Sequence, residues 1–248
     1  MKFENTDVWG FEHAIRGARN PMNSWHRSDS GEGCKNNSWD EHPDDYRLCK
    51  DCYSNQPCSP SKFVIGDNDM DLMKRLIRGG SEHRKFMRQI FVSVDITAPM
   101  YLWSELDTYK IGTVANSTSK MHKLATTPIT MDCFETDDYE GDLLVYDKEP
   151  YAECFRTDDI WEEIINHCET LRQRYVETKD KRYWKELIRL LPESWLQTRT
   201  WTANYEVLRN IVHQREGHKL TEWKSFIDWV KTLPYAKELI FLEDNDEG

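Results

Sequence analysis

The sequence predicts an α+β fold, and three features of the 248-residue chain carry that prediction. Apolar and polar residues alternate over residues 86–96, which is typical of a strand buried on one face. Apolar residues recur at helical spacing through most of residues 157–233. Residues 26–61, by contrast, are polar and almost free of aliphatic side chains, so they add little to a core. We therefore expect a single α+β domain over residues 1–248, with residues 26–61 as a polar, cysteine-rich insertion.

Composition excludes several classes of function. The net charge of -11 opposes the wrapping of duplex nucleic acid, because that affinity comes mainly from Lys and Arg side chains at phosphates. No segment has the apolar length needed to span a bilayer, and the N-terminal sequence lacks the basic start and apolar run of a signal peptide. The seven cysteines then favour a reducing compartment over a disulfide framework. We expect a cytoplasmic protein without a membrane or duplex nucleic-acid partner.

The cysteine-rich insertion is a candidate zinc site. Cys49 and Cys52 have the C-x-x-C spacing that places two thiolates on one metal ion, and Cys34 and Cys58 would complete a tetrahedral set. Bound zinc would explain how so polar a segment becomes ordered. A surface insertion without metal is the alternative, because the outer spacings match no common zinc finger.

Two segments before the predicted strand are expected to be helical or turn-forming. The first apolar segment, within residues 11–25, is helical or turn-forming and ends before Asn20-Pro21. Asp67 or Asn68 is expected to cap the next helix, and Gly79-Gly80 is expected to end it.

A further helix should begin at Pro99 and end at Gly112, with a core-facing side made of Leu102, Trp103, Leu106 and Tyr109. It leads into Asn116-Ser117-Thr118-Ser119, a hydroxyl and amide run that is either a phosphate or nucleotide contact or a solvated turn. Residues 131–151 are acidic and irregular, with a possible strand at 143–146.

Four helices are predicted in the C-terminal region. The first has Asp158 as its candidate cap, and Pro192 terminates the second. Residues 201–215 make the third, and the fourth ends near Leu233-Pro234.

Two separated segments resemble the flavin-dependent thymidylate synthase family. That family has a Leu-Pro, a Thr-Arg, an aromatic-Thr-x-Asn, a second Asn six residues on and an Arg five beyond it. The corresponding residues here are Leu191-Pro192, Thr198-Arg199, Trp201-Thr202-Ala203-Asn204, Asn210 and Arg215. Upstream, Glu82-His83, a strand and Ala98-Pro99 follow in the family's order. The resemblance covers about residues 63–233 and omits the cysteine insertion.

The family's central signature is changed in this chain. Counted from Ala98-Pro99, the family's Arg-His-Arg falls on Thr108, Tyr109 and Lys110, and Glu105 stands where the family has Gln. Counted back from the hydroxyl run, the family's Asn, Glu, Ser and Arg-Tyr are replaced by Asn116, Ser117, Ser119 and Met121-His122. The two counts require one extra residue between them, and Arg189 lies one residue out of register with the family's phosphate arginine. These changes remove positive charge where the family binds anions.

The resemblance implies a central antiparallel sheet packed with helices, and a homotetramer whose sites lie between subunits. It implies the ligands FAD, NADPH, methylenetetrahydrofolate and a pyrimidine nucleotide. The implied cofactor-binding residues are His83, Thr108, Tyr109, Lys110, Asn204 and Asn210. The nucleotide-binding candidates are Glu105, Lys110, Ser117, Ser119 and Arg215, and no catalytic residue is assigned.

Each candidate also has a purely structural interpretation. Asn side chains suit the edge of a flavin or pyrimidine, but Asn204 is also a candidate helix cap and Asn210 a candidate solvent-facing residue. Arg215 is either an anion ligand or half of a surface ion pair, and His83 is either a flavin neighbour or a packed core residue. The Glu105 carboxylate would repel a phosphate unless it is protonated or paired with Lys110, but it suits an amino group or sugar hydroxyls.

Three functions follow as hypotheses. The first is a divergent enzyme that transfers a one-carbon unit to C5 of a pyrimidine nucleotide, with hydride delivered through FAD. The second is a non-catalytic nucleotide-binding or regulatory protein on the same fold. The third is a zinc-stabilised interaction module built on residues 26–61.

Overall fold

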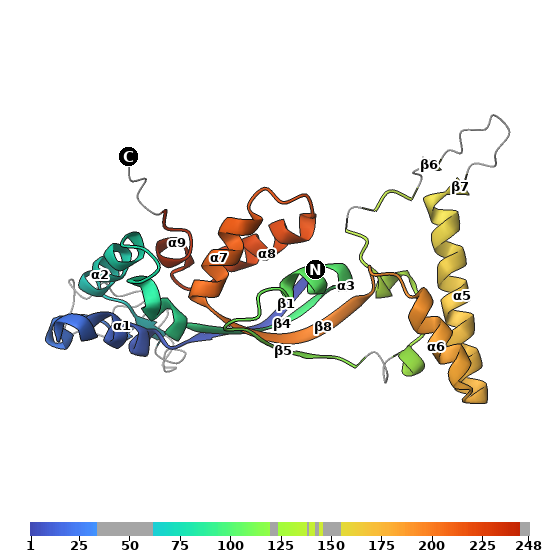
Figure 1. Ribbon diagram of the computed structural model, residues 1–248, viewed down its shortest axis with the longest axis horizontal. Coiled ribbons are helices and arrows are strands. Elements are labelled where there is room, and N and C mark those ends of the chain that lie inside the picture. The colour runs from blue at the N-terminus through green and yellow to red at the C-terminus, as the bar shows by residue number, and fades with distance from the viewer. Residues whose placement is uncertain (34–61, 120–123, 138, 142–143, 146–154, 244–248) are drawn as a thin grey trace, which may run out of the picture. The chain divides into compact units, whose positions relative to one another are not determined.

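A computed structural model of the protein describes residues 1–33, 62–119, 124–137, 139–141, 144–145 and 155–243 (Figure 1). The helices and strands in chain order are β1 (Lys2–Trp9), α1 (Phe11–Arg19), η1 (Asn20–Met22), η2 (Trp25–Arg27), β2 (Gly31–Gly33), β3 (Lys62–Val64), α2 (Asp67–Arg78), η4 (Arg84–Gln89), β4 (Phe91–Pro99), α3 (Met100–Leu106), β5 (Val114–Ser117), η5 (Met131–Cys133), β6 (Leu144–Val145), β7 (Phe155–Arg156), α5 (Thr157–Thr178), α6 (Lys181–Leu190), β8 (Leu196–Asn204), α7 (Tyr205–Arg215), α8 (Thr221–Lys231) and α9 (Ala236–Leu239). No helix in these described ranges is long and apolar enough to cross a membrane.

The main sheet has four strands in the order β1-β4-β8-β5. Side-chain hydrogen bonds show that β4 and β8 run antiparallel, since Asp95 accepts from Thr200 at 2.5 Å and the hydroxyls of Thr97 and Thr198 lie 2.7 Å apart. The predicted fold class, a central antiparallel sheet packed with helices, is confirmed.

The predicted strand over residues 86–96 begins later than the alternation suggests. Residues Arg84–Gln89 form a 3-10 helix, and the strand starts at Phe91. Phe86 and Met87 are consecutive and both buried, which an extended chain does not allow on one face of a sheet. From Phe91 onward the alternation holds, with a buried face made of Val92, Val94, Ile96 and Ala98.

Two strands of the main sheet differ from the sequence prediction. Residues 201–204 were expected to open a helix, but they end strand β8, and the helix α7 begins at Tyr205. The buried Trp201 and Ala203 alternate with the half-buried Thr202, which is a strand pattern hidden by the helical pattern that follows it. The other strand is β1, whose residues are mostly exposed because it lies at an edge of the sheet.

The described residues form two compact units. The first unit comprises Met1–Thr6, Val94–Lys110 and Val114–Trp201, and the second comprises Asp7–Ser93, Ile111–Thr113 and Thr202–Gly248. Strands β1, β4 and β8 contribute residues to both units. The single-domain assignment over residues 1–248 stays a prediction.

In the first unit, α5 and α6 lie side by side as a helical hairpin (Figure 1). Lys179 adopts a left-handed conformation with φ 58 after α5, and the Asp180 carboxylate caps α6 by accepting from the Arg182 amide at 2.9 Å. The hairpin packs on a small core made of Leu124, Ile129, Phe134, Cys168, Leu171 and Leu187. The predicted short strand at 143–146 is observed as β6, which pairs with β7.

An ion pair on α5 connects this helix to residues 125–129. The Glu169 carboxylate accepts from the Ile129 amide at 2.8 Å and from two nitrogens of Arg172 at 2.5 and 2.7 Å. Arg172 also donates to the Ala125 carbonyl at 3.2 Å. The hydrogen bonds from Arg172 lower the pKa of Glu169 from 4.5 to about 2, against the opposing effect of partial burial.

This depressed pKa predicts an acid-sensitive contribution to stability. Because the folded-state pKa lies below the unfolded one, the contribution is complete above about pH 4.5 and is lost as the pH falls toward about 2. Glu169→Gln should lower the free energy of unfolding by about 1–2 kcal/mol at neutral pH, and by less near pH 3. Urea unfolding at both pH values measures the difference, with Glu186→Gln in the exposed Glu186–Arg189 pair as the control. A pH-independent difference would contradict the prediction.

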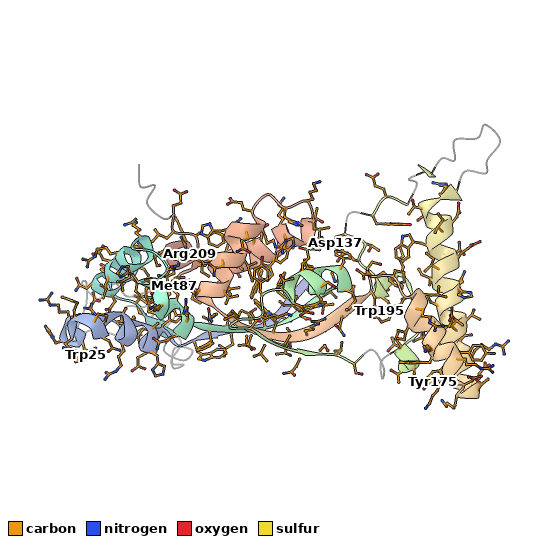
Figure 2. All side chains as sticks on the ribbon, viewed as in Figure 1. Trp25, Met87, Asp137, Tyr175, Trp195 and Arg209 are labelled. Carbon is orange, nitrogen blue, oxygen red and sulfur yellow. The ribbon has the colours of Figure 1, made fainter. Side chains whose placement is uncertain are left out.

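In the second unit, helices α1, α2, α7, α8 and α9 and the 3-10 helix η4 enclose a larger core. Figure 2 labels two of its buried residues, Met87 and Arg209. Arg209 donates to the Ile240 carbonyl at 2.7 Å, which attaches the C-terminal segment to α7. The Tyr205 hydroxyl donates to the Pro234 carbonyl at 2.6 Å and fixes the same region a second time.

Asp69 on α2 is a fully buried carboxylate with a complete set of donors. Its oxygens accept from Arg19 at 2.5 Å, from the Ser28 and Ser30 hydroxyls at 2.6 Å each and from the Asp29 amide at 3.2 Å. Burial raises the pKa of Asp69, but the hydrogen bonds from Ser28, Ser30 and Arg19 outweigh it and hold the pKa below 3.8. Asp69 thereby anchors residues 28–30 to α2.

The cap of α2 differs from the prediction. Gly66 occupies the N-cap position, so Asp67 and Asn68 lie inside the helix. The cap is supplied from elsewhere in the chain, because the Asp29 carboxylate accepts from the amides of Asn68 at 2.9 Å and Asp69 at 3.1 Å. The predicted stop at Gly79-Gly80 is confirmed, with Gly79 as the C-cap and Gly80 at φ 93.

Strands β2 and β3 form a short antiparallel ladder that pairs Gly33 with Lys62. The two residues that flank segment 34–61 therefore lie next to each other. The candidate zinc ligands Cys34, Cys49, Cys52 and Cys58 all fall in this segment, outside the described residues. Within the described ranges, His, Cys, Asp and Glu side chains form no group of three or more suited to a metal ion.

Candidate functional site

The candidate site in the first unit is built around α3, which follows β4 without a loop. Pro99 is extended and serves as the N-cap of α3, so the predicted start is confirmed. The helix ends at Leu106, six residues before Gly112, because the Thr108 amide and hydroxyl both donate to the Glu105 carbonyl, at 3.1 and 2.6 Å. Of the predicted core-facing residues, Leu102, Trp103 and Leu106 are buried and Tyr109 is half-buried.

An arginine from β8 is fixed against this helix. The Arg199 guanidinium carbon lies 4.3 Å from the centroid of the buried Trp103 ring, as in a cation–π contact. The Trp103 indole in turn donates to the Gln197 carbonyl at 2.9 Å. Arg199 Nη1 donates to both carboxylate oxygens of Asp107, at 2.9 and 3.1 Å, and its Nε donates to Gln197 Oε1 at 3.0 Å. We call Trp103, Asp107, Gln197 and Arg199 the Arg199 cluster.

The hydroxyl run joins this cluster through the backbone. Gln197 Nε2 donates to the Thr118 carbonyl at 2.9 Å, and the Thr118 amide donates to the Thr198 carbonyl at 2.9 Å. Val114–Ser117 is strand β5 at an edge of the sheet, so part of the run is a strand rather than a loop. Ser117 and Ser119 are both exposed, as a contact to a ligand requires.

A cavity of about 760 Å³ lies beside the end of this run. Figure 2 labels Asp137 and Trp195, two of its lining residues. Hydroxyl and carboxamide groups in the lining come from Thr97, Thr118, Ser119, Thr127, Thr136, Gln197 and Thr198. The charged groups are the N-terminal ammonium, Lys2, Asp132, Glu135 and Asp137.

The cavity is richer in acidic than in basic groups. The ammonium is already paired, at 2.9 Å from the Asp137 carboxylate and 3.8 Å from Glu135. Hydroxyl and carboxylate oxygens accept hydrogen bonds from amino groups and sugar hydroxyls, and the carboxylates repel phosphate. The lining therefore suits the base and sugar of a nucleotide.

The predicted nucleotide-binding residues of the first unit occupy different places. Ser119 lines the cavity, while Glu105, Lys110 and Ser117 are absent from the described lining. Glu105 is half-buried on α3, and Lys110 is exposed in the turn after it. Arg215 belongs to the second unit, where its guanidinium carbon lies 4.6 Å from the Trp223 ring centroid.

The predicted cofactor residues also divide between the units. Thr108, Tyr109 and Lys110 follow α3 in the first unit, and Thr108 and Lys110 are exposed. The remaining three lie in the second unit, where His83 is exposed at the start of η4.

The structure uses Asn204 as a helix cap. Asn204 ends β8 and caps α7, with Oδ1 accepting from the Val207 amide at 3.0 Å, and Asn210 is exposed. The predicted helix over residues 201–215 would have contained both Asn204 and Asn210. In the structure only Asn210 lies within α7. Asn204 also closely approaches Gly112, where φ is 79 and a Cβ would come within 2.8 Å of Asn204 Nδ2. This close approach explains the glycine.

Sequence reasoning missed Asp107 and Gln197. Asp107 immediately precedes the three residues at the signature position, and Gln197 immediately precedes the Thr198-Arg199 pair. A charge opposite to Arg199 was therefore available in the sequence. Only the packing of α3 against β8 brings Asp107 and Arg199 together.

No protein-family model matches the chain, and no curated protein matches it in sequence. Solved structures match it in fold. The flavin-dependent thymidylate synthase of Helicobacter pylori, complexed with FAD and dUMP, has a TM-score of 0.59 and 16% identity, covering 97% of this chain and 98% of that chain. A second structure of that enzyme, also with FAD and dUMP, gives a TM-score of 0.58 and 16% identity over 98% and 97% of the two chains.

The UMP/dUMP methylase PolB of Streptomyces cacaoi, bound with 5-Br dUMP, has a TM-score of 0.53 and 14% identity, covering 98% of this chain and 95% of that chain. At these identities the likeness establishes the fold and extends over nearly the whole chain. The resemblance inferred from the sequence motifs is confirmed at the level of the fold.

Proposed function

We propose that this chain binds a pyrimidine nucleotide and that its reaction is the transfer of a one-carbon unit to pyrimidine C5. The observation that carries the proposal is the fold match over 97–98% of the chain to proteins solved with dUMP or 5-Br dUMP. The names of both neighbours denote chemistry that adds one carbon to a uracil nucleotide. Fold likeness alone does not carry function to a new chain, so support must also come from the site.

The first unit offers that support. Its cavity of about 760 Å³ falls in the size range of small-molecule sites and is lined by hydroxyl, carboxamide and carboxylate groups. Thr118 and Ser119, from the hydroxyl run, form part of the wall. Carboxylates such as Asp132 would accept hydrogen bonds from sugar hydroxyls or a base N–H.

FAD is the proposed cofactor by resemblance, but the residues at the signature position do not by themselves fit its diphosphate. Of Thr108, Tyr109 and Lys110, only Lys110 is cationic, and the carboxylates of Glu105 and Asp107 precede it. Arg199 is the other nearby cation, and it forms an ion pair with Asp107. The homotetramer expected from the resemblance would supply further cations from a second copy. NADPH, methylenetetrahydrofolate, the zinc site and a cytoplasmic location stay predictions.

The shortage of cations at the signature position also favours a second function, nucleotide binding without catalysis. A nucleotide-binding protein without catalysis would keep the fold and the cavity while losing the cations that hold a flavin. The use of the Asn204 side-chain oxygen Oδ1 as a helix cap agrees with this alternative.

Isothermal titration with dUMP, UMP and uridine tests the proposal, together with the visible absorbance of the protein after incubation with FAD. We expect dUMP or UMP to bind, and we expect flavin absorbance to remain after gel filtration. Nucleotide binding without flavin uptake would establish the non-catalytic alternative. Failure of all three ligands to bind would overturn both.

A further inference from the structure

Arg199 is oriented by two contacts in addition to its ion pair with Asp107. Its guanidinium stacks on Trp103 at 4.3 Å, its Nε is bonded to Gln197, and only 12% of its side chain is exposed. An arginine normally loses much rotamer freedom when it binds an anion. A guanidinium that is already oriented loses less, which favours binding.

Asp107, the carboxylate partner of Arg199, is held less firmly. Its side chain is 55% exposed, and it is the C-cap residue of α3, where the helix dipole disfavours negative charge. Ion pairs with an exposed partner contribute little net free energy. Another anion therefore displaces Asp107 at small cost.

The strand register places one further hydrogen-bond donor, Ser117, on the same face of the sheet as Arg199. Because the Thr118 amide donates to the Thr198 carbonyl, Ser117 and Arg199 come opposite each other one residue further along these antiparallel strands. Opposite residues of an antiparallel pair project from the same face. The exposed hydroxyl of Ser117 thus accompanies the Arg199 guanidinium.

The cavity adjoins this position through a shared residue. Gln197 accepts from Arg199 Nε and also lines the cavity. The acidic cavity suits a base and a sugar. In the neighbouring Arg199 cluster, the buried Trp103 and Gln197 orient the positively charged guanidinium of Arg199. The two together match the two ends of a nucleotide.

We propose that Arg199 is the phosphate receptor of this chain and that Asp107 occupies it until a nucleotide phosphate takes its place. Phosphate, like carboxylate, presents paired oxygens to a guanidinium and forms charge-assisted hydrogen bonds with it. The assignment of the anion as a nucleotide phosphate rests on the proposed function. The anion site itself rests on the Arg199 cluster.

Titration of the full chain with UMP, uridine and inorganic phosphate at low salt tests the inference. Asp107→Asn removes the competing carboxylate and should tighten UMP binding by about two- to five-fold, leaving uridine unchanged. Arg199→Lys loses the fork and the stacking, and should weaken UMP binding by about ten-fold or more, toward the affinity for uridine. The matched controls are Glu177→Gln and Arg174→Lys, which make the same changes in the exposed Arg174–Glu177 pair and should leave UMP binding unchanged.

Several outcomes separate this inference from the proposed function. If UMP binds the wild-type chain no more tightly than uridine, or if Asp107→Asn leaves UMP affinity unchanged, the inference is wrong while nucleotide binding stands. If neither UMP nor uridine binds, the proposed function fails, yet phosphate binding that tightens in Asp107→Asn would still establish the anion site. Circular dichroism verifies that Arg199→Lys is folded, and Asp107→Asn decides the matter if it is not.

Discussion

Asp69→Ala is expected to lower the free energy of unfolding by about 3–5 kcal/mol, the usual cost of breaking a buried ion pair. Asp69 is fully buried, and the side chain of its partner Arg19 is 5% exposed. Without the carboxylate, the Arg19 charge is left buried beside the hydroxyls of Ser28 and Ser30. The Ser24 and Arg27 carbonyls, which also accept from Arg19, offset only part of that loss.

The same helix supplies a control for this prediction. Asp71→Ala removes a carboxylate of α2 that is 71% exposed and paired with Arg75 at 3.3 Å, and it should change stability little. Urea unfolding of both variants at neutral pH gives the comparison. Equal effects of the two substitutions would show that the buried network is not the anchor described above.

Gly10→Ala is expected to cost about 2–5 kcal/mol, combining backbone strain with an overlap that cannot relax. Gly10 is the N-cap of α1 and has φ 97, a conformation that side chains disfavour. A Cβ at this position would overlap the backbone carbonyl oxygen of Gln89. That oxygen belongs to η4, so it cannot move aside as a flexible side chain would.

Gly80→Ala separates the two contributions. Gly80 has a similar φ of 93, but a Cβ there meets nothing within 4 Å. It should therefore show the backbone strain alone, about 1–2 kcal/mol. A thermal or urea midpoint for Gly10→Ala as high as that for Gly80→Ala would contradict the predicted overlap.

Elements with a strong local pattern were predictable from the sequence. The buried side of α3 follows from the spacing of Leu102, Trp103 and Leu106, and the end of α2 follows from Gly79-Gly80. β8 was not predicted, because its alternation at Trp201 and Ala203 runs into the helical pattern of α7. Local propensity yields to tertiary pairing at such junctions.

The candidate site was harder to predict than the fold. Ser119 lines the cavity and Asn204 serves as a helix cap, and the binding role proposed for each stays a prediction. The Arg199–Asp107 pair joins residues that are far apart in the chain, and no periodicity reports such a contact. The family motifs drew attention to Arg199, and the structure shows that its partners are Trp103, Gln197 and Asp107.

The ladder between β2 and β3 has a consequence for how this protein can vary. Because Gly33 pairs with Lys62, the residues between them form an insertion whose flanking residues are adjacent. The entropic cost of closing such a loop grows only slowly with its length. The length and sequence of residues 34–61 can therefore change without moving the paired residues on either side, while Asp69 holds residues 28–30 on α2. Selection can act on its four cysteines separately from the rest of the fold.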